Sequence, residues 1–378
     1  MQIELTPQQK RDRAEFREFV AAEVAPRAGR FDREGAVPAR LVAQVAARGY
    51  LGALLPRAGS PPMDAVTYGL LNEEFGRGCS SLRSLLTVHN MVAHAVRRWG
   101  ARPLKERWLP GLAAGEVVAA FCLSEPGVGS DAAGVRTTAE PDGDHYVLEG
   151  AKKWITFGQL ADLFLVFARS EGRPTALLVE RGTRGLSVVP IEGMLGVRAS
   201  MLAELRFEGC RVPRENVVGR PGFGFSHVAS SALDWGRYSV AWGCVGLAQA
   251  CLDASLAYAG EREQFGARLK DHQLIRRMLT DMITNTKAAR LLCLHAGCLK
   301  ERGDPQGIVE TNVAKYFAST AASRAAADAV QIHGANGCSP DYPVERYLRD
   351  AKIMEIIEGS TQIQQLTIAE YGRQEQSL

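Results

Sequence analysis

The sequence has no Cys-x-x-Cys pair, no His/Cys spacing typical of a zinc site and no Gly-x-Gly-x-x-Gly motif. The first two absences argue against a redox dithiol and a bound metal, and the third leaves a Rossmann dinucleotide site without support. The eight cysteines lie mostly in apolar, Ala-rich surroundings. We therefore expect buried, reduced thiols and no metal.

Two further absences concern partners and location. The 378 residues carry a net charge of +3 without a long Lys/Arg run, so nothing indicates dedicated binding to nucleic acid or to a membrane surface. No apolar run approaches transmembrane length, and the N-terminus lacks the basic-then-apolar pattern of a signal peptide. The expectation is a cytoplasmic protein with neither kind of partner.

The pattern of elements predicts an α+β fold in three parts. Residues 1–116 have helical periodicity, beginning at a capping box in which Thr6 is the N-cap, Pro7 follows and Gln9 lies three residues on. Residues 117–222 contain short β-rich runs between turn signals. Residues 223–378 return to long, Ala-rich helical patterns suited to close helix packing, with Gly334 as a C-cap.

Residues 121–131 form a loop rich in glycines and hydroxyls directly after a predicted strand. Gly127 and Gly129 would allow backbone amides to approach a ligand, and Ser124 and Ser130 offer hydrogen-bond donors. An ordinary turn is the alternative interpretation.

Trp154 and Thr156 lie two residues apart on a predicted strand, so both could face one side. An aromatic plane beside a hydroxyl suits a flat redox ring with a polar edge. Taken alone, Trp154 is more typical of a core residue.

Glu358 stands between an apolar run and Gly359. Burial would raise its pKa and make it a suitable base near neutral pH, whereas most carboxylates at helix ends are solvated.

Together and in this order, these segments resemble the acyl-CoA dehydrogenase family. The resemblance spans nearly the whole chain and includes residues 104–110, 196–200, 262–266, 272–273, 331–337 and 358–359. It implies a helical domain (1–116), a β-barrel-like domain (117–222) and a four-helix bundle (223–378). It also implies one FAD per subunit, usually in a homotetramer, with a homodimer as the alternative.

The resemblance assigns roles by position. Contacts to the isoalloxazine ring would come from Leu123, Ser124, Trp154 and Thr156, with Gly129 and Ser130 close to the flavin and the thioester arm. The pyrophosphate and adenosine end of a neighbour's FAD would be held by Arg262, Gln264, Phe265, Gln273, Gln331 and Gly334. Ser360 and Gln362 would contact the flavin beside the base. Substrate binding would fall to Arg83, Ser130, Asp234 and Arg237.

In the family mechanism the base removes the α-proton while hydride leaves the β-carbon for flavin N5. The thioester carbonyl is polarised by a flavin hydroxyl and by the backbone N–H of the base. Some members carry the base on an earlier helix, but the matching residue here is Gly236. Glu358 is therefore the predicted base.

Three residues depart from the family pattern. Arg83 lies on the helix that usually floors an apolar acyl pocket, at the spacing where glutaryl-CoA dehydrogenases bind a distal carboxylate. The alternative is an Arg turned to solvent or paired with a core acid. Glu370 replaces an Arg on the CoA side, which disfavours nucleotide phosphates and favours a carrier-bound phosphopantetheine arm. Phe157, where Asn is common, has no clear meaning.

Local phrasing at residues 79–84, 237–246 and 351–360 is similar to the acyl-carrier-protein dehydrogenases of hydroxymalonyl- and methoxymalonyl-type polyketide extender pathways. We expect an FAD-dependent dehydrogenase of a small polar acyl thioester on acyl carrier protein (ACP), with an electron-transfer flavoprotein or oxygen as acceptor. One alternative is a catabolic acyl-CoA dehydrogenase, short-chain or glutaryl-CoA-like. The other is a non-catalytic, flavin-bound nucleic-acid-binding homologue.

Overall fold

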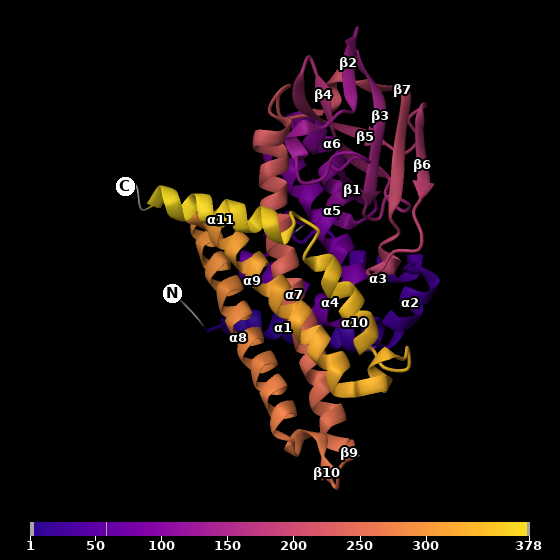
Figure 1. The fold of residues 1–378 in the computed structure, drawn as a ribbon. Coiled ribbons are helices and arrows are strands. Elements are labelled where there is room, and N and C mark those ends of the chain that lie inside the picture. Colours follow the sequence, from indigo (N-terminus) through magenta and orange to yellow (C-terminus); the bar gives the residue numbers. More distant parts are fainter. Residues whose placement is uncertain (1–3, 58, 376–378) are drawn as a thin grey trace.

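The structure is a computed structural model that describes residues 4–57 and 59–375. Figure 1 shows a β-sheet at one end of the molecule and a small hairpin at the other, with one long helix, α7, running between them. The α, then β, then α order expected from the sequence is confirmed.

The N-terminal part is helical. Its α-helices are α1 (Pro7–Phe19), α2 (Ala28–Glu34), α3 (Ala39–Ala47), α4 (Ala65–Gly78), α5 (Ser80–Trp99) and α6 (Arg102–Ala114). The predicted capping box is present: the Gln9 N–H donates to the Thr6 hydroxyl at 3.2 Å, and the Thr6 N–H donates to the Gln9 side chain at 3.0 Å. After α1, a π-helical turn and a 3-10 turn that contains Pro26 carry the chain directly into α2.

The middle part is an open, mixed sheet. Its strands are β1 (Ala119–Cys122), β2 (Thr138–Asp142), β3 (His145–Ile155), β4 (Leu163–Ser170), β5 (Arg173–Glu180), β6 (Leu186–Pro190), β7 (Ala203–Pro213) and β8 (Val217–Val218). The order is β6-β7-β3-β2-β4-β5-β8, with β1 parallel to β4. Among the described residues β6 and β8 do not pair, so the barrel-like domain is not a closed barrel.

The C-terminal part contains α7 (Ser230–Glu261), α8 (Gln273–Arg302), α9 (Gln306–His333), α10 (Val344–Met354) and α11 (Thr361–Glu375). The hairpin strands β9 (Glu263–Gln264) and β10 (Ala267–Arg268) join α7 to α8. Gly334 caps α9 as predicted. Helix α4 packs so closely on α7 that a Cβ on Gly246 would lie 1.9 Å from the Glu73 carbonyl oxygen. The helical parts thus share one core.

Helix α7 and the turn before it, Gly224–Glu261, are long and apolar enough to cross a membrane by length and composition. The expectation that no apolar run approaches that length is therefore wrong. However, 72% of the most apolar window is buried inside the protein, as in the core helix of a globular fold.

Six of the eight cysteines are also buried, as the sequence predicted.

Candidate functional site

Glu358 lies in the short connection between α10 and α11, in left-handed backbone with φ of +55°, and Gly359 follows at +93°. Three side chains hold the two carbonyls of this strained turn. Arg237 Nε donates to the Glu358 carbonyl at 3.1 Å, and Lys315 Nζ donates to the Gly359 carbonyl at 2.7 Å. Gln364 donates to both. Such over-determination is what keeps an unfavourable backbone in place.

The Glu358 carboxylate has the electrostatics of a base that works near neutral pH. Burial raises its pKa to about 7, while the charges of Arg237, Lys315 and Arg83 act in the opposite direction. Its Oε2 atom is buried and has no hydrogen-bond partner in the part of the chain that the structure describes. A buried carboxylate oxygen without a partner is ready to accept a substrate proton.

Gly236 on α7 provides the room for this carboxylate. A Cβ at Gly236 would lie 2.4 Å from Oε2 of Glu358 and 2.7 Å from Sδ of Met91. The position that carries the base in some relatives is thus occupied here by the Glu358 side chain itself.

Arg83 on α5 is fully buried, with 1% of its surface exposed. Its guanidinium donates to Thr87 at 2.7 Å and to Ser239 at 3.3 Å. No ion pair within residues 4–57 and 59–375 includes Arg83, and its Nε atom has no partner. Both alternatives considered from the sequence, a solvent-facing Arg and an Arg paired with a core acid, are therefore wrong.

A neutral polar network continues from Arg83 into the core. Ser239 lies 2.6 Å from the Thr87 hydroxyl and donates to Asn72 at 2.7 Å. The Tyr68 hydroxyl beside it is buried without a hydrogen-bond partner among the described residues, and burial raises its pKa to about 12. Tyr68 therefore stays a neutral donor, so the inner end of the site combines a cation with hydroxyl groups.

Asp234 and Arg237 lie one turn apart on α7. Asp234 forms an ion pair with Lys300, which packs against the ring of Trp235 with its Nζ 5.2 Å from the ring centre. The other Asp234 oxygen, Oδ1, is buried without a partner in the described part of the chain. Arg237 contacts the Glu358 turn through its Nε atom, and Asp234 lies one helical turn before it on α7.

The loop after β1 is anchored by a buried ion pair. Lys152 Nζ lies 2.7 Å from Glu125 Oε1 and donates to the Leu123 carbonyl at 3.1 Å. Ser124 is bonded twice to Lys153, through its carbonyl and through its hydroxyl, each at 3.0 Å. These bonds leave Gly129 and Ser130 exposed at the outer end of the loop. A Cβ at Gly129 would meet no protein atom within 4 Å, so the space over it is open to a ligand.

Trp154 and Thr156 do not share a strand face in the way the sequence argument assumed. Strand β3 ends at Ile155, and an irregularity between Lys152 and Ile155 places Trp154 at φ of +63°. The Trp154 indole is 47% exposed, which is unusual for so large an apolar side chain. An exposed indole next to the anchored loop offers a flat apolar surface, which fits the ring of FAD.

Ser360 and Gln362, the predicted flavin contacts, closely follow Glu358 in the chain. The Ser360 hydroxyl accepts the Ile363 N–H at 3.4 Å at the start of α11, and Gln362 is exposed.

The remaining predicted cofactor residues lie at the other end of α7. Phe265, at φ of +54°, is 97% exposed at the tip of the β9–β10 hairpin, and Arg262, Gln264 and Gln273 are exposed beside it. His333, between Gln331 and Gly334, stacks on Tyr258 near the end of α7 at 4.2 Å, which brings these residues into the same region. Along α7 this region is roughly 39 Å from Gly236. Residues there are therefore too far away to contact a group bound next to Glu358 of the same chain.

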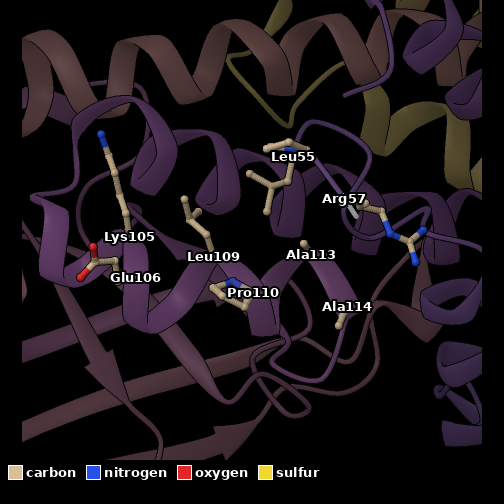
Figure 2. A pocket seen from close by; sticks show the side chains of 9 residues that line it. Leu55, Arg57, Lys105, Glu106, Leu109, Pro110, Ala113 and Ala114 are labelled. Carbon is tan, nitrogen blue, oxygen red and sulfur yellow. The ribbon is translucent and has the colours of Figure 1, made fainter. Parts of the chain in front are cut away.

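A surface hollow of about 530 Å³ lies between α6 and residues 55–57, lined by Leu55, Pro56, Arg57, Lys105, Glu106, Leu109, Pro110, Ala113 and Ala114 (Figure 2). None of the predicted site residues lines it. In Figure 2 Lys105 and Glu106 lie at one side and Arg57 at the other, with an apolar floor between them. It brings no catalytic groups together and carries no argument for the reaction.

Sequence reasoning missed Lys315, Gln364, Thr87 and Ser239. Lys315 stands within the Ala-rich pattern of α9, where a lone cation on a buried face was the available signal. The others are common polar residues, and only the fold brings them to Glu358 and Arg83.

Three family models match the chain. They describe the N-terminal domain of acyl-CoA dehydrogenase over residues 6–116, the middle domain over residues 120–210 and the C-terminal domain over residues 222–372. An acyl-CoA dehydrogenase of Bacillus subtilis (strain 168) is 39% identical over 98% of this chain and 99% of its own length. The mitochondrial short-chain specific acyl-CoA dehydrogenase of Rattus norvegicus is 38% identical over 97% of this chain and 90% of its own.

Solved structures give the same picture. A structure described as the electron transferring flavoprotein of Acidaminococcus fermentans has a TM-score of 0.94 and 36% identity, covering 98% of this chain and 99% of that one. A glutaryl-coenzyme A dehydrogenase in complex with glutaryl-CoA has a TM-score of 0.93 and 34% identity, with coverage of 98% and 96%. FkbI, described as acting in biosynthesis of the methoxymalonyl extender unit of a polyketide, has a TM-score of 0.87 and 34% identity, with coverage of 96% and 99%.

Proposed function

Because this chain belongs to the acyl-CoA dehydrogenase family, whose members are FAD-dependent oxidoreductases of acyl thioesters, we propose that its substrate is a small polar or anionic acyl group on ACP. The proposed role is oxidation of an acyl group for a polyketide extender unit. The observation that carries the proposal is Arg83, a buried guanidinium that has no carboxylate partner among the residues that the structure describes.

The cost of burying Arg83 is the reason for this assignment. A guanidinium out of water needs a counter-charge, and burial already lowers the pKa of Arg83. Thr87, Ser239 and Met354 supply only neutral acceptors. A carboxylate or hydroxyl oxygen on the acyl tail would accept the remaining hydrogen bond of the Arg83 guanidinium, whereas a plain hydrocarbon tail would leave that donor unsatisfied.

In the proposed reaction, bound FAD supplies the acceptor for the hydride from the substrate's β-carbon. Glu358 removes the α-proton through its unpartnered Oε2 atom. No acceptor within the described residues takes the backbone N–H of Glu358, which leaves it to polarise the thioester carbonyl. Arg237 and Lys315 hold the turn that aims both groups.

Delivery by ACP is supported by the local sequence similarity at residues 79–84, 237–246 and 351–360 and by the likeness to FkbI. Glu370 supports it less than the sequence suggested, because Arg373 pairs with it at 2.7 Å and reduces its repulsion of phosphate. We further propose an electron-transfer flavoprotein as the acceptor, with oxygen as the alternative, a homotetramer as the assembly and a cytoplasmic location.

The second candidate is a catabolic acyl-CoA dehydrogenase of the short-chain or glutaryl-CoA type. The rat short-chain enzyme and the glutaryl-CoA complex are about as similar to this chain as FkbI is. A buried Arg at the inner end of the site would suit glutaryl-CoA as well. The nucleic-acid-binding alternative has no comparable support, because Glu358 keeps the environment of a base.

An anaerobic titration of the holoprotein separates these candidates. The same short hydroxylated and carboxylated acyl groups are offered on ACP and on CoA, and loss of the oxidised flavin's visible absorbance is followed. Bleaching at lower concentrations of the ACP-bound forms is expected. Bleaching by CoA esters alone would overturn delivery by ACP, and bleaching only by unsubstituted acyl chains would overturn the role of Arg83.

A further inference from the structure

Three contacts between α5 and α7 follow the two helices in opposite directions, so the helices are antiparallel. Arg83 meets Ser239 at the inner end, Met91 faces Gly236 at the level of Glu358, and Trp99 donates to Ser231 at 2.8 Å at the outer end. From Arg83 to Trp99 the helix rises by roughly 24 Å. A substrate with its tail at Arg83 and its reacting carbons at Glu358 therefore points its carrier arm toward Trp99.

A cluster of cationic and aromatic side chains, here named the outer patch, surrounds that end. Its members are Arg98, Trp99, Arg173, Arg220, Phe223 and His227. The three rings are in contact: the ring centres of Trp99 and His227 are 5.3 Å apart, and those of His227 and Phe223 are 4.7 Å apart. The Arg98 guanidinium lies 5.2 Å from the Trp99 ring centre.

The two other arginines join the outer patch through the loop before α7. The Phe223 N–H donates to the Arg220 carbonyl at 3.0 Å. A Cβ on Gly222 would lie 3.1 Å from Cδ of Arg173, so the start of β5 packs against this loop. Strand β5, the end of α5 and the entry to α7 thus meet at one place.

The three arginines of the outer patch have no ion-pair partner among the described residues. Arg98, Arg173 and Arg220 are exposed, and none takes part in an ion pair between residues that the structure describes. Elsewhere on the surface many arginines do have acidic partners, such as Arg102 with Glu106 and Arg107 with Glu180. Phe223 adds an apolar side chain, 43% exposed, among the three cations.

We propose that the outer patch is the docking surface for the acidic face of the carrier protein that delivers the acyl group. The assignment rests on the proposed function. Three guanidinium groups without ion pairs, around the exposed Phe223 ring and the partly buried Trp99, complement a helix rich in carboxylates with a few apolar side chains. The position of the patch supplies the second argument, because a partner seated there stands where the arm leaves the site.

The test uses the full-length holoenzyme and rapid anaerobic flavin reduction, which requires no electron acceptor. Arg98→Glu, Arg173→Glu, Arg220→Glu and the triple variant are compared with Arg184→Glu. Arg184 is an exposed arginine without an ion pair in the described chain, and it lies in the turn between β5 and β6. Each enzyme receives one acyl group on ACP, on CoA and on free pantetheine. Thermal unfolding and FAD content establish that every variant is folded.

The concentration of acyl-ACP that gives half of the maximal rate should rise at least tenfold for the triple variant. It should rise less for each single variant and should not change for Arg184→Glu. Higher salt should weaken the binding of acyl-ACP by the wild type until it approaches that of the triple variant, because salt screens the charges of the arginines. The maximal rate and the reaction with pantetheine should not change. Equal losses with ACP and pantetheine, a loss with CoA alone, or an unchanged response to ACP would each overturn the docking surface. Wild-type turnover of CoA esters but not ACP esters would overturn the proposed carrier itself.

Discussion

At the scale of single residues, the position of the Glu358 carboxylate depends on Gly236, which has no side chain. Substituting Gly236→Ala places a Cβ within 2.4 Å of Oε2 and must displace the carboxylate. A displacement of about 1 Å can cost on the order of 100-fold in rate. We expect flavin reduction to slow by roughly 10- to 100-fold while FAD content is retained, as measured by stopped-flow absorbance. Gly260→Ala, on the same helix with nothing within 4 Å, should react at the wild-type rate.

The pKa of Glu358 controls the pH dependence of the reaction. The carboxylate is the active form, so flavin reduction should rise with pH through about 7 and then level off. Lys315 is one of the three cations that lower this pKa. In Lys315→Met the pKa of Glu358 should therefore rise, and the rate profile should move to higher pH.

Rates measured from pH 5.5 to 9 for wild type, Lys315→Met and Lys352→Met test this displacement. Lys352 is exposed and pairs with Glu355, so its removal is the control. A profile that keeps its midpoint in Lys315→Met would contradict the electrostatic role of Lys315.

Arg83 is the residue that should set acyl preference. In Arg83→Leu, the reaction with acyl groups that carry a distal carboxylate should fall by about 10- to 100-fold, because a charge-assisted hydrogen bond is lost. Unsubstituted short acyl groups should react no worse. The ratio of kcat/KM for the two kinds of substrate is the readout, and Arg83→Lys should recover part of the loss. An unchanged ratio would remove the argument for an anionic tail.

At the scale of elements, the α4–α7 crossing depends on glycines that let two backbones touch. In Gly246→Ala the new Cβ meets the Glu73 carbonyl oxygen at 1.9 Å. We expect a loss of about 1–3 kcal/mol in the free energy of unfolding, or more if the helices separate. Gly260→Ala lies on the same helix in open space and should instead stabilise by about 0.5–1 kcal/mol. Denaturant titration of both holoproteins compares them.

The same scale shows what the sequence could and could not predict. Caps and periodicity give the helices well, as at Thr6 and Gly334, because those signals are local. The sequence does not predict the bulge at Trp154, because nothing in the local pattern indicates that a tryptophan adopts a φ of +63°. Arg83 and Glu358 were found because a charge within an apolar run is visible in sequence. Lys315 and Gln364 act through carbonyls of a turn that only the fold brings to them.

At the scale of the whole molecule, the β9–β10 hairpin presents an exposed apolar surface. Phe265 is almost fully exposed and Leu274 is 72% exposed, which is costly for a free subunit and suits a neighbour's surface. In Phe265→Ser we expect weaker assembly and lower FAD retention. Light scattering after gel filtration and the ratio of flavin to protein absorbance measure both. Leu195→Ser, another exposed apolar residue (54%), is the control.

The antiparallel pairing of α5 and α7 has a consequence for how such a protein can diverge. In the proposed function, one end of the pair would contact the tail of the acyl group and the other end would face the partner that delivers it, with Glu358 between them. Residues roughly 24 Å apart without shared partners act additively, so a change at either end leaves the other intact. A lineage could thus exchange one delivery system for another by surface substitutions alone, and keep both its chemistry and its acyl preference.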